Sequence, residues 1–203
     1  MSDYPTALAY FEQLPDGWAS FAGCVANASL LTTERSRAAL DGVFDKLPGP
    51  LRVLPDFFAR RVRWLPEVVH VATSLAIHDF RFRDDDEGFL AWLEKMNREL
   101  LSGDDMSRAF HAASPADLVA RVPVLWEEFH NGCPLELFDQ GPTHASFSLV
   151  HPAALFHRLS LESHRRTLAI ALAKSNAAQL QVTVTTRAAS ADLARTELLC
   201  HWR

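Results

Sequence analysis

The sequence predicts an α+β protein in which a mainly helical N-terminal region, residues 1–132, packs on a C-terminal ββαββ unit, residues 133–203. Two stretches alternate between apolar and polar residues, 180–185 and 194–202, as strands with one buried face do. Between two expected pairs of strands lies the stretch 152–173, which has no glycine and no proline after its first residue. Such a stretch is typical of one long helix laid across a four-stranded antiparallel sheet.

Length and composition are those of one soluble globular domain. The chain has 203 residues, 48% of them hydrophobic and 22% charged, which is enough to bury one substantial core. The formal net charge of −5 argues against a general nucleic-acid binder, because phosphate recognition needs a basic surface. We expect a single domain, residues 1–203, without a nucleic-acid partner.

Cysteine usage and the N-terminus favour a reducing compartment. The three cysteines, Cys24, Cys133 and Cys200, are far apart and form no CxxC motif, so no disulfide framework is expected. The first residues lack the basic and apolar regions of a secretory signal, and no stretch reaches the apolar length of a membrane span. The sequence therefore predicts a cytoplasmic protein with no membrane span.

The N-terminal half reads as short helices separated by turns. A turn signal at residues 14–17 ends the first expected helix, and Pro48-Gly49-Pro50 separates two later ones. In chain order the pattern predicts a helix at 4–14, a strand or extended segment at 21–31, and helices at 34–47, 51–63 and 66–78.

A basic and aromatic stretch stands in the third of these helices, residues 51–63. Phe57 and Phe58 are followed by Arg60, Arg61 and Arg63. This combination occurs in nucleic-acid-binding surfaces, but the negative net charge favours a solvated helix face.

The next helices have recognisable starts and stops. The acidic run 84–87 precedes an apolar pattern that extends to Leu100, which favours a capped helix start over a metal site. A further helix is expected at 106–112. Ser114 and Pro115 then open another, which continues with a kink at Pro123 until Asn131-Gly132.

The C-terminal unit begins with a hairpin. Its strands are expected at 135–137 and 145–149, with the turn at 139–142. After the long helix, strands at 180–185 and 194–202 form the second pair. The last strand would bury one face, made by Ala194, Thr196, Leu198, Cys200 and Trp202.

No motif announces a reaction. The chain has nine histidines, but no HExxH, GxSxG, phosphate-loop or dinucleotide-binding glycine pattern. His151, His157 and His164 form the closest grouping and show no zinc-ligand spacing. We therefore expect no catalytic residue and no metal, and keep an enzyme that uses His130 or His151 as a base as a third hypothesis.

Three segments carry a resemblance to a known group. They are Pro123-Val124-Leu125-Trp126 with Asn131-Gly132, then Pro152 at the start of the long helix, and residues 194–202 at the end. With the order of elements, they resemble the superfamily of haem nitric-oxide/oxygen-binding (H-NOX) domains, four-vinyl-reductase ligand-binding domains and Bet3-type trafficking subunits. The chain looks most like an uncharacterised myxobacterial paralogous family related to that group.

The resemblance implies a test for haem. A complete likeness to the haem sensors would place an iron-binding histidine in a helix before the sheet, where His111 stands. The family's Tyr-x-Ser-x-Arg motif holds the haem propionates, and the corresponding segment here is Phe147-Ser148-Leu149-Val150-His151. Because the Tyr and the Arg are missing, we expect a relative without haem or any other cofactor.

Two functional hypotheses follow. In the first, the chain is a non-enzymatic cytoplasmic regulatory or sensory protein that holds a small apolar ligand between helices and sheet. The ligand would touch His111, Trp126, Phe129 and His130. In the alternative, the fold is an interaction module that docks a protein partner or forms a homodimer without a ligand. A haem-binding gas sensor or a hydrolase-like enzyme is the third hypothesis.

Overall fold

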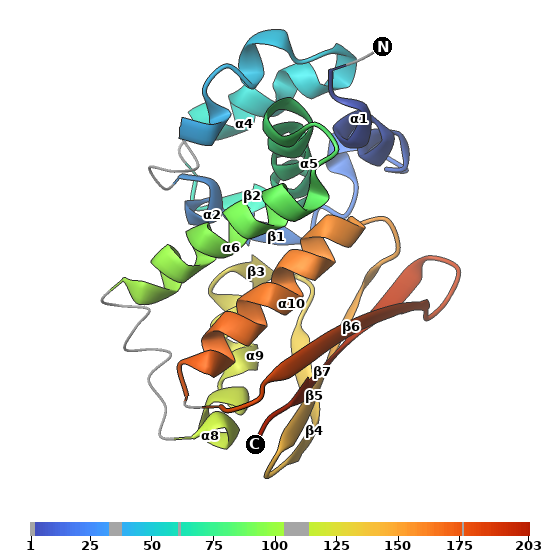
Figure 1. The fold of residues 1–203 in the computed structure, drawn as a ribbon. Coiled ribbons are helices and arrows are strands. Elements are labelled where there is room, and N and C mark those ends of the chain that lie inside the picture. The colour runs from blue at the N-terminus through green and yellow to red at the C-terminus, as the bar shows by residue number, and fades with distance from the viewer. Residues whose placement is uncertain (1–2, 33–37, 61, 104–113, 176) are drawn as a thin grey trace. The chain divides into compact units, whose positions relative to one another are not determined.

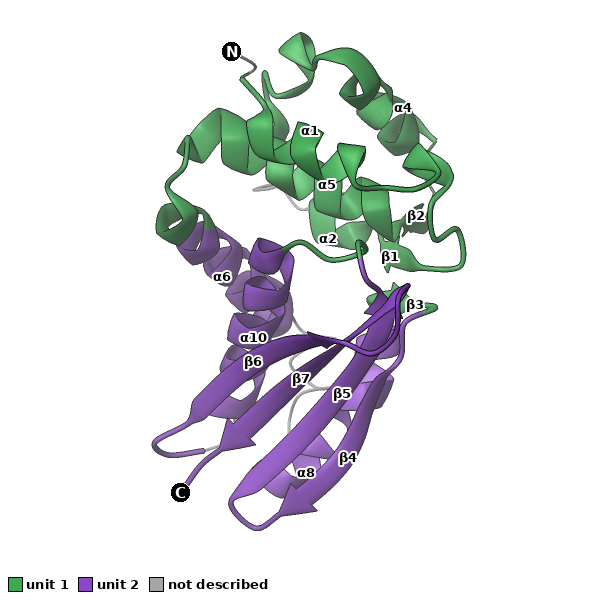
Figure 2. Ribbon diagram, turned by 90° about the vertical axis from the view of Figure 1, so that its right-hand side faces the viewer, with its two compact units in different colours: residues 1–89, 129–132, 154–157 green, residues 90–128, 133–153, 158–203 purple. Residues whose placement is uncertain are grey.

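The structure, a computed structural model, describes residues 3–32, 38–60, 62–103, 114–175 and 177–203. The chain forms two compact units (Figure 2). Unit 1 comprises residues 1–89, 129–132 and 154–157; unit 2 comprises 90–128, 133–153 and 158–203. These units do not coincide with the subregions 1–132 and 133–203, because residues 90–128 group with the C-terminal sheet. The expectation of a single domain stays a prediction.

Unit 2 is built on an antiparallel sheet of four strands in the order β4-β5-β7-β6 (Figure 1). The strands are β4 (Leu135–Gly141), β5 (His144–Pro152), β6 (Gln181–Ala188) and β7 (Leu193–His201). The two central strands pair over their whole length, from His144 opposite His201 to Pro152 opposite Leu193. The predicted α+β class and the four-stranded antiparallel sheet are confirmed.

One face of this sheet is apolar and covered. The expected inner face of β7 is buried, since each of its five residues is at most 6% exposed: Ala194, Thr196, Leu198, Cys200 and Trp202. Helix α10 (Arg158–Ala173) packs against β6 and lies across one face of the sheet (Figures 1 and 2). The alternation seen in the sequence therefore marks the side on which the core of unit 2 forms.

The remaining helices of unit 2 begin where the sequence signals predict. Helix α6 (Asp86–Ser102) starts in unit 1 with Asp86 and Glu87 in its first turn. The hydroxyl of Ser114 accepts a hydrogen bond from the backbone N–H of Asp117 and caps α8 (Pro115–Val119). Helix α9 (Val122–Glu127) carries Pro123 in its first turn and packs against β4.

Unit 1 is organised around α5 (Glu67–Ile77), which is buried at every residue except His70. Its apolar residues cover more than one face, so neighbours must surround it. Packed against it are α1 (Pro5–Glu12), α4 (Leu54–Ala59), and strands β1 (Val25–Asn27) and β2 (Trp64–Pro66). Strand β1 is the centre of a three-stranded antiparallel sheet, between β2 and β3 (His130–Asn131).

Short elements join these parts of unit 1. A four-residue helix, α2 (Ser29–Thr32), follows β1, and a π-helical turn, η4 (His78–Phe82), extends α5. Unit 1 also contains helical residues at 38–40 and three 3-10 turns: η1 (Gly17–Ala19), η2 (Phe44–Lys46) and η3 (Gly49–Val53).

Two element boundaries differ from the sequence prediction in unit 2. Pro152 ends β5 instead of opening the long helix, which begins at Arg158. Proline is tolerated at a strand end, where its missing N–H costs no ladder bond. The first hairpin turns at Pro142-Thr143, later than predicted, because β4 continues past a bulge at Phe138.

In unit 1 the stretch 51–63 is not the single helix that was predicted. Its described residues form the end of η3 and the six-residue α4, and strand β2 follows at Trp64. Backbone pairing with β1 explains the strand, since it gives Trp64 and Leu65 antiparallel partners that local sequence preference does not reveal. The start of the helix predicted at 34–47, and the helix predicted at 106–112, lie outside the described residues.

In the described residues, no helix is both long enough and apolar enough to span a lipid bilayer.

Candidate functional site

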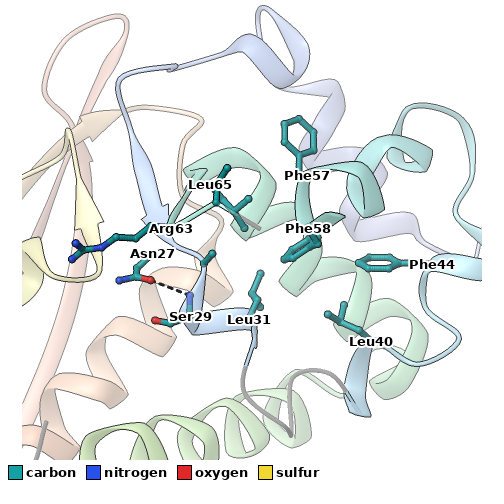
Figure 3. Close-up of a pocket in the computed structure, with 11 residues that line it drawn as sticks. Asn27, Ser29, Leu31, Leu40, Phe44, Phe57, Phe58, Arg63 and Leu65 are labelled. Carbon is teal, nitrogen blue, oxygen red and sulfur yellow. Dashed lines mark hydrogen bonds between the residues drawn. The ribbon is translucent and has the colours of Figure 1, made fainter. Parts of the chain in front are cut away.

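A pocket of about 740 Å³ lies in unit 1 beside the three-stranded sheet (Figure 3). The chain segments around it are the end of β1 with α2, the turn before and within η2, the end of α4, and the start of β2. Its lining consists of Asn27, Ala28, Ser29, Leu31, Leu40, Phe44, Phe57, Phe58, Val62, Arg63 and Leu65.

Aromatic rings form one side of this pocket. Phe44 and Phe58 contact each other with ring centroids 5.8 Å apart, and Phe57 packs on Trp18 at 6.3 Å. In Figure 3 the rings of Phe44, Phe57 and Phe58 lie on one side, with Leu40 beside them. Pro55 in the first turn of α4 begins this short helix and places the two adjacent phenylalanines at its end.

The opposite side is polar. The side-chain carbonyl of Asn27 accepts a hydrogen bond of 3.0 Å from the backbone N–H of Ser29, which turns the chain from β1 into α2. The N–H of Ala28 donates to the carbonyl of Arg63 at 2.8 Å and joins this turn to β2. Figure 3 shows Asn27, Ser29 and Arg63 together on this side, with the guanidinium of Arg63 pointing away from the phenyl rings.

A buried carboxylate stands two residues after Leu65. The side chain of Glu67, at the first position of α5, has no exposed surface and accepts a 3.0 Å hydrogen bond from Nδ1 of His130 on β3. Its second oxygen lies 3.4 Å from Nδ1 of His70, one turn along α5. The rings of His70 and His130 meet edge to face with centroids 6.3 Å apart.

These histidines keep the Glu67 carboxylate ionised. Burial by itself raises the pKa of Glu67, but the charge and hydrogen bond of His130, with the nearby imidazole of His70, outweigh burial and lower the pKa below its usual range. Burial and the charge of Glu67 together raise the pKa of Tyr10, whose hydroxyl donates to the carbonyl of Leu155 at 2.7 Å. The cluster therefore joins α5 and β3 by a buried hydrogen bond between an imidazole and a carboxylate.

A second histidine cluster fixes the end of α5. Nδ1 of His78 lies 3.2 Å from Asp79, and its Nε2 lies 2.9 Å from Asp86 at the start of α6. The other oxygen of Asp79 accepts from the backbone N–H of Ala7 at 2.9 Å. Within the described ranges, no group of three or more His, Cys, Asp or Glu side chains is placed to hold a metal ion.

In unit 2, His151 belongs to a buried hydrogen-bond chain. Its Nδ1 lies 2.8 Å from the carbonyl of Pro152 and donates to it, so Nε2 accepts from the hydroxyl of Thr196 at 3.0 Å. The hydroxyls of Thr196 and Thr186 are 2.8 Å apart. Burial lowers the pKa of His151, which the bond to Pro152 partly offsets, and the ring is held in its neutral form.

Of the four residues predicted to touch a ligand, the three that the structure describes do not line the pocket of unit 1. His111 lies outside the described residues. Trp126 belongs to unit 2, where its Nε1 donates to the carbonyl of Cys133 at 2.9 Å and its ring meets that of His164 at 5.0 Å. Phe129 and His130 belong to unit 1, with His130 held by Glu67. As a ligand site these four residues stay a prediction.

Sequence reasoning missed Glu67 and most of the pocket. Glu67 looks like an ordinary acidic residue in a first helical turn, and its partner His130 is 63 residues away. One signal was present: the basic and aromatic stretch 57–63 supplies four of the lining residues. The predicted solvated face therefore describes this stretch only in part, because the same stretch also lines the pocket.

Two comparisons of the sequence identify no relative: no family model matches it, and no curated protein matches it significantly. Solved structures do match. A protein studied for haem distortion in the H-NOX family aligns with a TM-score of 0.51 over 98% of this chain and 95% of its own, at 7% identity. The fold is H-NOX-like.

Further solved structures agree. One from work on haem redox potential and porphyrin distortion gives a TM-score of 0.51 over 86% of this chain and 94% of its own, at 8% identity. A mutant of the T. tengcongensis H-NOX gives 0.50 over 100% and 98%, at 6% identity. At such low identities the structural alignments show a shared H-NOX-like fold alone. A myxobacterial paralogous family stays a prediction.

The segment that corresponds to the haem propionate motif does not fit that role. Phe147 and Leu149 are at most 1% exposed, and neither offers a charge or a hydrogen bond to a propionate. His151 is buried and neutral, with both ring nitrogens already hydrogen-bonded. Residues 147–151 therefore offer no cation that could pair with a haem propionate.

Proposed function

We propose that this chain is a non-enzymatic, cytoplasmic sensory or regulatory protein whose N-terminal unit binds a small, largely apolar molecule in the pocket of unit 1. The pocket carries the proposal. Its volume of about 740 Å³ lies within the range of small-molecule sites, roughly 300–1,000 Å³. Seven of its eleven lining residues are large hydrophobic ones, and polar groups gather on one side, as in sites that bury a ligand's body and orient one end.

The fold supports a ligand-binding role by analogy. The H-NOX-like structures that align with this chain include proteins studied for haem distortion, so this architecture can hold a small molecule elsewhere. Haem is not the ligand that we propose here, because the segment of β5 that corresponds to the propionate motif offers no cation.

The surroundings of two histidines support a non-enzymatic role. His130 and His151, the bases of the enzyme hypothesis, have 5% and 2% of their surfaces exposed. His130 is hydrogen-bonded to Glu67 and His151 to Pro152 and Thr196, so neither is presented to a substrate.

A protein-interaction module is the second candidate, and one surface favours it. Phe138 on β4 and Val124 on α9 are 56% and 67% exposed, and these two elements of unit 2 pack against each other. Exposed large hydrophobic side chains on neighbouring elements are a feature of contact surfaces. Sedimentation velocity over a concentration series tests self-association; a monomer at every concentration removes the homodimer.

Fluorescence titration with N-phenyl-1-naphthylamine, a neutral apolar probe, tests the pocket. We expect saturable binding to the full chain, with about tenfold weaker affinity in Phe58→Ala, because an aromatic contact with the probe is lost. Phe138→Ala is the matched control: it removes an exposed phenylalanine of unit 2 and should leave the affinity unchanged.

Native mass spectrometry of the purified protein complements this titration, since a retained ligand adds mass that is absent after denaturation. Probe binding that is lost in Phe138→Ala and kept in Phe58→Ala would place the site on the exposed surface of unit 2 and reject the proposal. Absence of saturable binding would reject it as well.

A further inference from the structure

We infer that the ligand of this pocket is an amphipathic anion, with an apolar body held among the phenylalanines and one anionic group at the polar side. This inference rests on the proposed function. It assigns a role to the basic and aromatic stretch 57–63, whose composition alone favoured a solvated face.

The charge of the lining is one-sided. Among the eleven lining residues that the structure describes, Arg63 is the only charged one, and none is acidic. Asn27 and Ser29 add an amide and a hydroxyl on the same side as Arg63 (Figure 3). An anionic group with hydrogen-bond acceptors therefore complements this side of the pocket, whereas a cationic group would be repelled by Arg63.

A second arginine borders the aromatic side. The guanidinium carbon of Arg60 lies 5.3 Å from the ring centroid of Phe57, so this cation is held at a lining ring. Arg63 in turn lies over the ring of Trp64 at 5.3 Å. Both cations are thereby positioned by aromatic neighbours around one apolar pocket, although the whole chain carries a net charge of −5.

The position of Arg63 indicates which part of the ligand is charged. Arg63 is exposed and its guanidinium points away from the phenyl rings. A charge buried among the rings would lose its hydration without a partner, which costs several kcal/mol. The anionic group therefore stays at the polar, solvated side while the body enters the aromatic side. A carboxylate, a sulfonate and a phosphate monoester share this chemistry.

Two probes with the same aromatic body separate the charge from the apolar contact. 8-Anilino-1-naphthalenesulfonate carries a sulfonate, and N-phenyl-1-naphthylamine is the same skeleton without it. In the full chain at low salt we expect Arg63→Gln to weaken binding of the sulfonate about fivefold, the size expected of one partly exposed ion pair, and to change the neutral probe less than twofold.

Salt and a charge-matched variant are the controls. In the unaltered chain, 0.5 M NaCl should weaken the sulfonate and spare the neutral probe, because salt screens exposed charges. Arg187→Gln removes the same charge from an exposed arginine of unit 2 and should affect neither probe. Arg60→Gln should weaken only the sulfonate, by a smaller factor.

The outcomes distinguish this inference from the proposed function. Saturable binding of the neutral probe, with a sulfonate affinity that is insensitive to Arg63→Gln, overturns the anionic ligand and leaves the apolar pocket in place. An equal loss in Arg63→Gln and Arg187→Gln overturns it too, because only net charge would then matter. If neither probe binds, both the inference and the proposed function fall.

Discussion

At the scale of single residues, Glu67 in unit 1 requires polar partners, because its carboxylate has no exposed surface. It is a fully buried carboxylate that accepts a hydrogen bond from His130 at 3.0 Å and lies 3.4 Å from Nδ1 of His70. Removal of one partner from such a buried polar pair leaves the other partner buried and unsatisfied. The pair therefore makes the attachment of β3 to α5 specific.

Glu67→Ala should lower the free energy of unfolding by about 3–5 kcal/mol at pH 7, since it leaves His130 buried without its carboxylate. Urea unfolding followed by circular dichroism measures this change. Glu136→Ala removes an exposed glutamate of β4 and should leave the unfolding free energy unchanged. A small effect at Glu67, equal to that at Glu136, would contradict the buried pair.

His151 should make stability depend on pH in unit 2. Its pKa is lowered in the folded state from an ordinary value of 6.5, so the unfolded chain binds a proton at a higher pH than the folded chain. The contribution of His151 is complete above pH 6.5 and is lost as the pH falls toward the folded pKa. Urea unfolding at pH 7.5, 6.5 and 5.5 should show this loss.

A variant assigns the loss to that residue. His151→Gln should flatten the pH dependence of the unfolding free energy over this interval, whereas His201→Gln, at an exposed histidine, should leave it as steep as in the unaltered protein. Equal slopes in all three proteins would mean that burial of His151 does not govern its titration.

At the scale of elements, Trp202, which directly follows β7, connects the end of that strand to the turn between β4 and β5. Trp202 is 5% exposed, its indole N–H donates to the carbonyl of Pro142 at 3.0 Å, and its backbone N–H donates to that of Thr143 at 2.9 Å. The indole ring of Trp202 thus fills part of the core, and the two N–H groups of this residue hold the turn between β4 and β5.

Trp202→Ala should cost about 3–5 kcal/mol of unfolding free energy, because a buried indole leaves a cavity. Trp202→Phe retains most of the apolar contact and loses the hydrogen bond to Pro142, so a cost of about 1–3 kcal/mol is expected. Chemical denaturation of the two variants gives both values. A near-neutral alanine variant would reject the inward orientation of this residue.

The same elements show what the sequence could predict. Residues 194–202 alternate over nine positions, and such a long pattern identifies both the strand and its buried face. Strands β1 and β2 have three residues each and carry no period of their own. They exist because their backbones pair, Ala26 with Leu65, and that pairing is invisible until the chain is folded.

The candidate site was less predictable for a related reason. Its lining comes from four short segments between residues 27 and 65, none of which has a motif. Only the aromatic and basic residues of 57–63 were conspicuous, and composition alone could not distinguish a solvated face from a pocket wall. The partner of Glu67 lies on β3, so local sequence gave no reason to expect this buried hydrogen bond.

At the scale of the whole molecule, the chain passes between its two units five times. Unit 1 takes two short pieces from the second half of the sequence, 129–132 and 154–157. Both carry buried contacts: His130 pairs with Glu67, and the carbonyl of Leu155 accepts from Tyr10. Residues 1–89 therefore lack partners that their own core requires.

A fragment of residues 1–89 should consequently not fold alone, although it contains the whole candidate pocket. Without His130 the fragment would bury the Glu67 carboxylate against His70 only, and without Leu155 it would leave the Tyr10 hydroxyl unsatisfied, each a penalty of at least about 1 kcal/mol in a small domain of marginal stability. We expect a far-ultraviolet circular dichroism spectrum of an unfolded chain and no cooperative urea transition, against one cooperative transition for residues 1–203. A cooperative transition in the fragment would show that unit 1 is autonomous, and would replace the prediction of a single domain by two domains, of which the first carries the ligand site.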